Sequence, residues 1–230
     1  GLHTLTRCLR PKIGSSPGRY RLVFCNFVGH LRAMSTSKNT ASFIVETSAV
    51  LFLKHGYEGT SLSMLTKATG LTKGAIYGNF KDKTALAEAC FEYSFSKVEQ
   101  SVLKALNAND PPKACMRAFF AYYRTYDQLI SELGSCPLIS FGIQSTYNSP
   151  QLLLRVNEAI HRIEDYLTST LKRGVDRQEI YLGIPETVFA KQLFALIQGG
   201  VSQSLITNDM KYLRNTASYL EYLFESSTRS

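Results

Sequence analysis

Residues 60–83, TSLSMLTKATGLTKGAIYGNFKDK, contain the signals for two short helices joined by a glycine turn. Thr60 or Ser61 can cap the first helix, because a hydroxyl oxygen accepts a hydrogen bond from a free N–H group of the first helical turn. Gly70 ends that helix, and Thr72 can cap a second one over KGAIYGN. This pattern predicts a helix-turn-helix whose second helix enters the major groove of DNA.

The predicted second helix has the composition of a helix that approaches DNA. Gly74 leaves room for close approach, while Ile76 and Phe80 are predicted to face the core. Hydroxyl, ammonium, phenol and amide groups come from Thr72, Lys73, Tyr77 and Asn79. Asp82 can cap the following helix, where Lys83 lies in the first turn and can bind a phosphate.

The rest of the chain shows helical periodicity, which predicts an all-α fold. An apolar face at Ile44, Ser48, Leu51 and Phe52 indicates a helix that Gly56 ends. Proline and glycine breaks then delimit further helices, at about residues 83–107, 112–133, 137–148, 150–173, 186–207 and 211–224.

The net charge of +8 is unevenly distributed along the 230 residues. Residues 1–33 contain six basic residues and no acid, so only two net positive charges remain for the rest. This segment can mimic a transit peptide, but it precedes Met34 and a polar STSKNT run. We expect it to be a leader translated from upstream or added to the chain, with a targeting role as the alternative.

The five cysteines form no CxxC pair, and the four histidines are scattered. We therefore expect reduced thiols in a cytoplasmic protein, with no metal site and no cofactor. No apolar run reaches the ~18 residues that a membrane span needs.

The stretch from Phe43 to Leu86 resembles the N-terminal domain of the TetR family of bacterial transcriptional regulators. The matching residues are Ile44, Phe52, Gly56, Tyr57, Thr60, Ser61, Gly70, Leu71, Lys73, Gly74, Ile76, Tyr77, Phe80, Lys83 and Leu86. The resemblance covers about residues 40–90. It departs at Leu65 and Thr66, where the family commonly has an Ile-Ala pair.

The resemblance implies a DNA-binding domain over residues 34–83 and a ligand-binding and dimerisation domain over residues 84–230. The DNA-facing set would be Thr60, Thr72, Lys73, Gly74, Tyr77, Asn79 and Lys83. The chain would bind a palindromic operator on double-stranded DNA as a homodimer, most simply as a repressor that a small-molecule effector releases.

The larger domain offers candidates for an effector pocket and for a dimer interface. Aromatic and polar residues in its middle suggest a site for a hydrophobic or aromatic effector, and our candidates are Tyr123, Tyr126, Gln144 and Tyr147. The alternative is that these aromatics are plain core. Gly199 and Gly200 suggest a close helix contact, either across a dimer or within one subunit.

Cys136 lies in a Gly-Ser-Cys-Pro-Leu segment that resembles one found in a subgroup of the family. Some of those regulators use a cysteine in this region to sense electrophiles, and a thiol near a helix N-terminus can react as thiolate. The alternative is an inert buried thiol.

Two other functions remain open from the sequence. A helical interaction module without DNA binding would keep the fold but lose salt-dependent affinity for DNA. A helical enzyme would need a catalytic constellation, and no such residue pattern stands out, so we expect no enzyme activity.

Overall fold

The computed structural model describes the backbone of residues 20–227 and the side chains of residues 39–146 and 149–226. Over this part of the chain it contains ten helices and no strand, which confirms the predicted all-α fold. The chain divides into two compact units, residues 1–41 and 42–230, and all side-chain contacts discussed below lie within the second.

The first helix, α1 (Tyr20–Gly59), is interrupted near its end. Gly56 has φ 75° and ψ 179°, a conformation that is essentially restricted to glycine. The predicted apolar face leads up to this break, and Ile44 and Phe52 on it are buried. The side chains of the predicted leader, residues 1–33, lie outside the described residues, so its origin stays a prediction.

Two short helices follow, α2 (Leu62–Thr69) and α3 (Lys73–Asn79). The hydroxyl of Ser61 caps α2, Gly70 ends α2 in a left-handed conformation, and the hydroxyl of Thr72 caps α3. These local interactions are the ones the sequence predicts, and they produce the expected helix-turn-helix.

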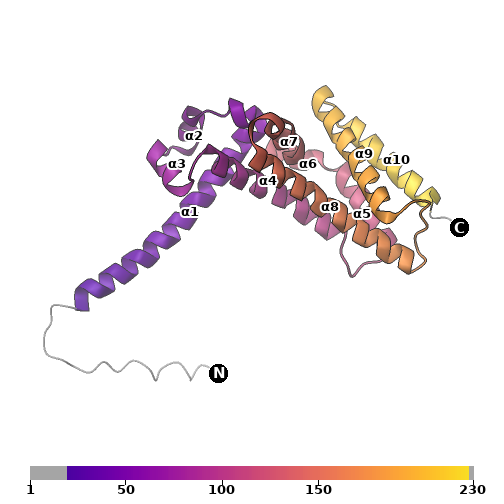
Figure 1. The fold of residues 1–230 in the computed structure, drawn as a ribbon, viewed down its shortest axis with the longest axis horizontal. Helices are drawn as coiled ribbons and strands as arrows, with labels where there is room; N and C mark the ends of the chain where they lie inside the picture. The colour runs from indigo at the N-terminus through magenta and orange to yellow at the C-terminus, as the bar shows by residue number, and fades with distance from the viewer. Residues whose placement is uncertain (1–19, 228–230) are drawn as a thin grey trace, which may run out of the picture. The chain divides into compact units, whose positions relative to one another are not determined.

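Helix α4 (Lys83–Ala105) leads from the helix-turn-helix into the larger domain (Figure 1). The Asp82 carboxylate caps it by accepting a hydrogen bond from the N–H of Ala85 at 2.8 Å. One face of α4 is buried against α5, α7 and α8. The buried residues of α4 are Leu86, Ala87, Cys90, Phe91, Ser94, Phe95, Val98 and Val102.

Four helices build the middle of the larger domain: α5 (Pro112–Arg124), α6 (Asp127–Leu133), α7 (Pro137–Asn148) and α8 (Pro150–Asp176). The sequence predicts one helix over residues 112–133, and this is wrong, because the chain turns at Thr125 and Tyr126. The N–H of Thr125 donates to the carbonyl of Tyr122, only three residues back, at 3.0 Å. The turn places the Tyr126 side chain in the core, where its hydroxyl donates to Cys136 Sγ.

The last two helices, α9 (Glu186–Thr207) and α10 (Lys211–Ser227), pack against each other (Figure 1). Three ion pairs connect α10 to α5 and α6: Arg117–Glu225, Arg124–Glu221 and Arg214–Asp127. Such partly exposed pairs stabilise a fold by only about 0–1 kcal/mol each, so apolar packing holds α10 in place. No helix of the described residues is long and apolar enough to cross a bilayer.

The two adjacent glycines of α9 have different surroundings. A Cβ atom on Gly200 would lie 3.1 Å from Thr216 Cβ and 3.3 Å from Leu213 Cα, both on α10. Gly199 is exposed, and a Cβ atom there would have nothing within 4 Å. Gly200 therefore makes the close contact within the subunit, whereas Gly199 lies on the outer face.

Gly200→Val is expected to lower the free energy of unfolding by about 2 kcal/mol, because the added side chain would push α9 and α10 apart. The control is Gly78→Ala, because a Cβ atom on this helical glycine would have no other atom within 4 Å. This variant should leave the free energy of unfolding unchanged or raise it by up to about 1 kcal/mol. Urea unfolding followed by circular dichroism measures both. A Gly200→Val midpoint equal to that of the wild type would contradict the close contact.

Candidate functional site

The first residues of α3 are exposed. Lys73 and Gly74 lie open to solvent, and the Oγ1 of Thr72 accepts a hydrogen bond from the N–H of Ala75 at 3.2 Å. A Cβ atom on Gly74 would approach only the Thr72 hydroxyl, at 3.9 Å. This end of α3 thus presents an ammonium group beside backbone that another molecule can approach closely.

The opposite face of α3 packs into the small domain, by which we mean the end of α1 together with α2 and α3. Ile76 is fully buried and Phe80 is half-buried against the core, as predicted. Tyr77 and Asn79 are also half-buried. The Nδ2 group of Asn79 donates to the carbonyl of Ala75 at 2.9 Å, which commits one amide hydrogen to its own helix. Asn79 is therefore less available to a ligand than Lys73.

Thr60 is predicted from the sequence to face DNA, and the structure corrects this. Its side chain is fully buried, and its Oγ1 donates to the carbonyl of Gly56 at 2.6 Å. The N–H of Thr60 donates to the same carbonyl at 3.1 Å. Both bonds hold the chain between α1 and α2, so Thr60 is a structural residue, while the neighbouring Ser61 is exposed and caps α2.

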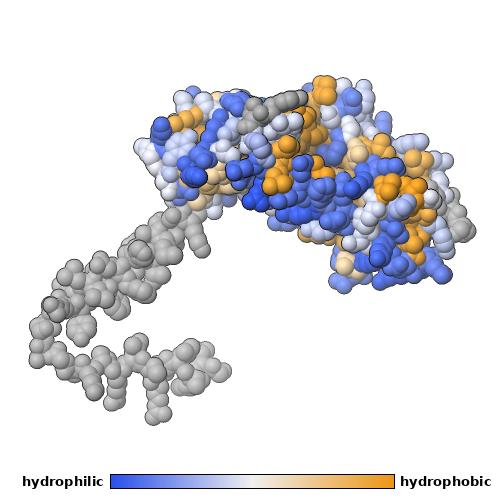
Figure 2. All heavy atoms as spheres, in the orientation of Figure 1, coloured by the Kyte–Doolittle hydropathy of each residue, from blue (hydrophilic) through white to orange (hydrophobic). Residues whose placement is uncertain are grey.

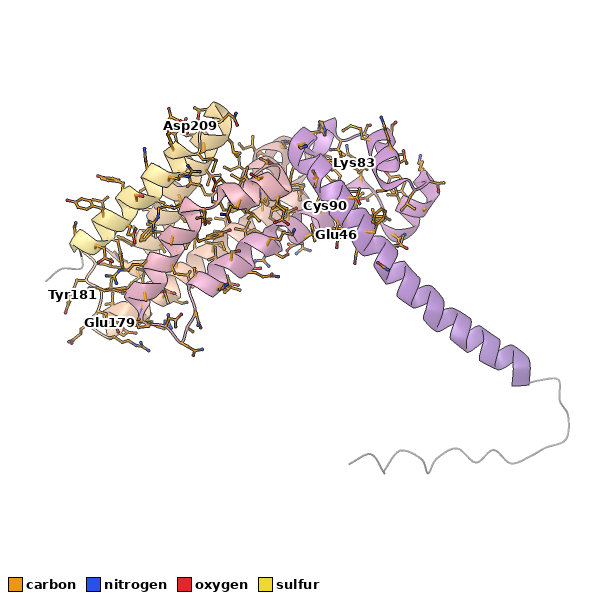
Figure 3. All side chains as sticks on the ribbon, turned by 180° about the vertical axis from the view of Figure 1, so that it is seen from behind. Glu46, Lys83, Cys90, Glu179, Tyr181 and Asp209 are labelled. Carbon is orange, nitrogen blue, oxygen red and sulfur yellow. The ribbon has the colours of Figure 1, made fainter. Side chains whose placement is uncertain are left out.

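Lys83 begins α4, and Figure 3 labels it among the helices of the small domain. Its Nζ lies over the ring of Tyr57, 4.6 Å from the centroid, in a cation–π contact. The hydroxyl of Tyr57 also forms a 2.8 Å hydrogen bond with Thr84 Oγ1. Tyr57 therefore positions the start of α4. Sequence reasoning missed this role, because nothing local in the sequence indicates contact between Tyr57 and Lys83.

Polar groups of the larger domain converge around α5, α6 and the start of α7. Tyr123, Tyr126 and Cys136 are all buried, and the Tyr126 hydroxyl donates to Cys136 Sγ at 3.3 Å. The ring of Tyr122 packs edge to face on Tyr123 and Tyr126, with centroid distances of 4.9 and 5.6 Å. We call these four residues the tyrosine–cysteine cluster. It unites three of the five predicted effector residues.

The hydroxyl of Tyr123 has no hydrogen-bond partner among the described residues, although it is fully buried. Leaving such a group unpaired costs about 1–3 kcal/mol. The Tyr122 hydroxyl lies near Ser101 but forms no well-aligned bond. Burial raises the pKa of Tyr123, Tyr126 and Cys136, so at neutral pH all three keep their protons. The cluster therefore offers neutral O–H and S–H groups.

The remaining two predicted effector residues are Gln144 and Tyr147. Gln144 Oε1 accepts a hydrogen bond from the N–H of Tyr57 at 2.7 Å, so its side chain is committed to the end of α1. The sequence-based assignment considered only the aromatic neighbours of Gln144 in the sequence, and a role of Gln144 toward an effector stays a prediction. The side chain of Tyr147 lies outside the described residues, and its role stays a prediction.

A surface groove of about 530 Å³ runs between α4 and α5 beside the tyrosine–cysteine cluster. Tyr122 lines it, together with Ser101, Lys104, Ala105, Ala118, Ala121 and Thr125. Tyr122 thus contacts both the groove and the rings of Tyr123 and Tyr126. Among the described side chains, no group of three or more histidines, cysteines or acids could hold a metal ion.

Two family models match this chain. Residues 44–90 match the bacterial regulatory proteins of the tetR family, and residues 112–220 match the tetracyclin repressor-like C-terminal domain. A solved TetR-family transcriptional regulator from Cytophaga hutchinsonii is 30% identical and superposes with a TM-score of 0.78, covering 85% of this chain and 98% of that one. The chain belongs to the TetR family of transcriptional regulators.

Other relatives agree. A TetR regulator from Chloroflexus aurantiacus is 28% identical, with a TM-score of 0.79 over 85% of this chain and 98% of that one. The regulator BetI of Yersinia pestis is 29% identical over 161 residues, 68% of this chain and 76% of BetI. The regulator AcrR of Shigella flexneri is 37% identical over 68 residues, which are 30% of this chain but only 32% of AcrR. These relatives of the TetR-family chain are transcriptional regulators, not enzymes.

In this TetR-family regulator, Thr60→Val is expected to lower the free energy of unfolding by about 1 kcal/mol, because valine lacks the hydroxyl that donates to the carbonyl of Gly56. At a temperature where the variant is folded, its affinity for DNA should stay within about threefold of the wild type. Urea unfolding and fluorescence anisotropy test both. A tenfold loss of affinity at unchanged stability would instead mean that Thr60 contacts DNA.

Proposed function

We propose that this regulator is a ligand-responsive repressor that binds a palindromic operator as a homodimer and leaves it when a small hydrophobic or aromatic effector binds. The observation that supports this most is the exposed start of α3, where Lys73 and Gly74 stand on the second helix of a helix-turn-helix. In that motif the second helix lies in the major groove.

The proposed DNA contacts differ in kind along α3 and α4. The seven residues of α3 span about 10 Å at 1.5 Å per residue, so one subunit reads only a few base pairs. Lys73 and the exposed backbone at Gly74 would approach the bases. Lys83 and the phenol of Tyr77 would bind phosphates, which position the protein without reading sequence.

The proposed dimer interface is the outer face of α9 and α10. Figure 2 shows apolar side chains exposed over α9, and on this helix Leu196 is 53% and Ile206 76% exposed. On α10, Tyr219 and Tyr222 are 60% and 66% exposed. Exposed apolar surface of this extent is typical of an interaction site. Gly199, with nothing within 4 Å, leaves room for the close approach of a second copy.

The proposed effector site is the tyrosine–cysteine cluster. The unpaired hydroxyl of Tyr123 can donate to a carbonyl or a similar acceptor, while the surrounding rings favour an apolar or aromatic body. An effector would enter from the groove between α4 and α5 by displacing Tyr122. It can shift the regulator away from DNA only by as much as its affinities for the two forms differ.

The burial of Cys136 favours an effector that binds reversibly over an electrophile that reacts with the thiol. Cys136 is fully buried, and desolvation raises its pKa, so the reactive thiolate is scarce at neutral pH. We therefore propose that the effector is a neutral molecule bound by the cluster. Alkylation of Cys136 would require the cluster to open first.

The DNA-binding proposal predicts that Lys73→Ala weakens operator binding about tenfold and reduces the slope of log affinity against log salt by about one. The DNA would be selected from a random pool by the full-length chain and then titrated by fluorescence anisotropy. The control is Lys172→Ala, at an exposed lysine of α8. Equal binding to selected and scrambled DNA, or an unchanged affinity in Lys73→Ala, would contradict the proposal.

The effector proposal predicts that Tyr123→Phe keeps or raises stability, by up to about 1 kcal/mol, because it removes an unpaired hydroxyl. The matched control, Tyr126→Phe, loses the bond to Cys136 and should be less stable than Tyr123→Phe. In thermal-shift screening of aromatic carbonyl compounds, any compound that stabilises the wild type should lose that effect in Tyr123→Phe. A compound that stabilises both equally would place the effector elsewhere.

A further inference from the structure

The end of α1 is held by a side chain from the larger domain. Gln144 of α7 accepts the hydrogen bond of the Tyr57 N–H at 2.7 Å, across 87 positions of sequence. The space for this side chain exists because residue 56 is glycine. A Cβ atom there would lie 1.6 Å from Gln144 Oε1 and 2.2 Å from its Cδ.

The Gly56–Tyr57 peptide is in turn connected to the DNA-facing elements. The carbonyl of Gly56 accepts both the N–H and the hydroxyl of Thr60, the residue before the cap of α2. The Lys83 ammonium lies over the ring of Tyr57, 4.6 Å from the ring centroid, and the Tyr57 hydroxyl forms a hydrogen bond with Thr84. A displacement of Tyr57 would therefore move the proposed phosphate contact at Lys83.

Helix α7 also reaches the tyrosine–cysteine cluster. Cys136 stands immediately before its first residue and Gln144 near its last turn, about 12 Å apart along the helix axis. Between them, Phe141 packs on Phe52 of α1 and on Phe91 of α4, with centroid distances of 6.3 and 5.5 Å. Helix α7 therefore connects the tyrosine–cysteine cluster to the Gln144–Tyr57 hydrogen bond.

We propose that Gln144 is a positioning residue, which holds Tyr57, and through it Lys83, in the arrangement that binds DNA. This proposal deepens the proposed function and rests on it for the role of Lys83. A shift of α7 when the cluster is occupied would lengthen the Gln144–Tyr57 hydrogen bond and release Lys83 from its phosphate.

The test compares Gln144→Met, which keeps the length of the side chain but offers the Tyr57 N–H only a weak thioether acceptor, with Gln144→Glu, which keeps an oxygen acceptor. Thr146→Val, at an exposed position on the same helix, is the control. Hydrogen exchange of the full-length chain, without DNA, should be at least tenfold faster at the Tyr57 amide in Gln144→Met. It should be unchanged in Thr146→Val and nearly unchanged in Gln144→Glu.

Operator affinity gives the second measurement. Gln144→Met should bind the operator about tenfold more weakly than the wild type. When the same comparison is made between proteins that both carry Lys83→Ala, the loss should be at most threefold, because Gln144 and Lys83 act on the same DNA contact. Unchanged exchange at Tyr57, or a full tenfold loss in the Lys83→Ala background, would overturn the proposal. If the wild type binds no DNA specifically, the proposed function fails, and the exchange rates still decide whether Gln144 positions Tyr57.

Discussion

Gly56 interrupts α1 near its end in a backbone conformation that other residues adopt only under strain, and the side chains of Thr60 and Gln144 both form hydrogen bonds with the Gly56–Tyr57 peptide. The carbonyl of Gly56 accepts a hydrogen bond from the hydroxyl of Thr60, which lies just before α2. The ring of the next residue, Tyr57, contacts the ammonium group of Lys83 at the start of α4. The missing Cβ leaves the space that Gln144 occupies. One glycine thus permits both the break in α1 and the contact with Gln144 of the larger domain.

The parts of the fold that depend on local interactions were predictable. Ser61, Thr72 and Asp82 cap helices within three residues of their own positions, so the pattern of hydroxyl and carboxylate groups indicates each helix start. The break between α5 and α6 was not predictable, because no proline or glycine marks it. It is associated with the burial of Tyr126 and its bond to Cys136.

The residues of the candidate sites also fall into a group that local motifs predict and a group that only three-dimensional contacts reveal. Lys73 and Gly74 are exposed on α3, where their place in a helix-turn-helix predicts them to be. Thr60 was assigned to DNA by the family resemblance and Gln144 to the effector by its aromatic neighbours in the sequence, yet both side chains bond to backbone groups at the end of α1. A polar side chain that bonds to a backbone group cannot be distinguished from a binding residue by sequence pattern alone. The unpaired hydroxyl of Tyr123 likewise emerges only from its three-dimensional surroundings.

In the proposed complex with DNA, two copies of this regulator place their α3 helices in neighbouring major grooves of one operator. Hydroxyl-radical footprinting of the full-length chain on its selected DNA tests this directly. The predicted result is two protected patches related by a dyad, about one helical turn or a multiple of it apart, on one face of the duplex. A single protected patch, or uniform weak protection along the DNA, would contradict the claim.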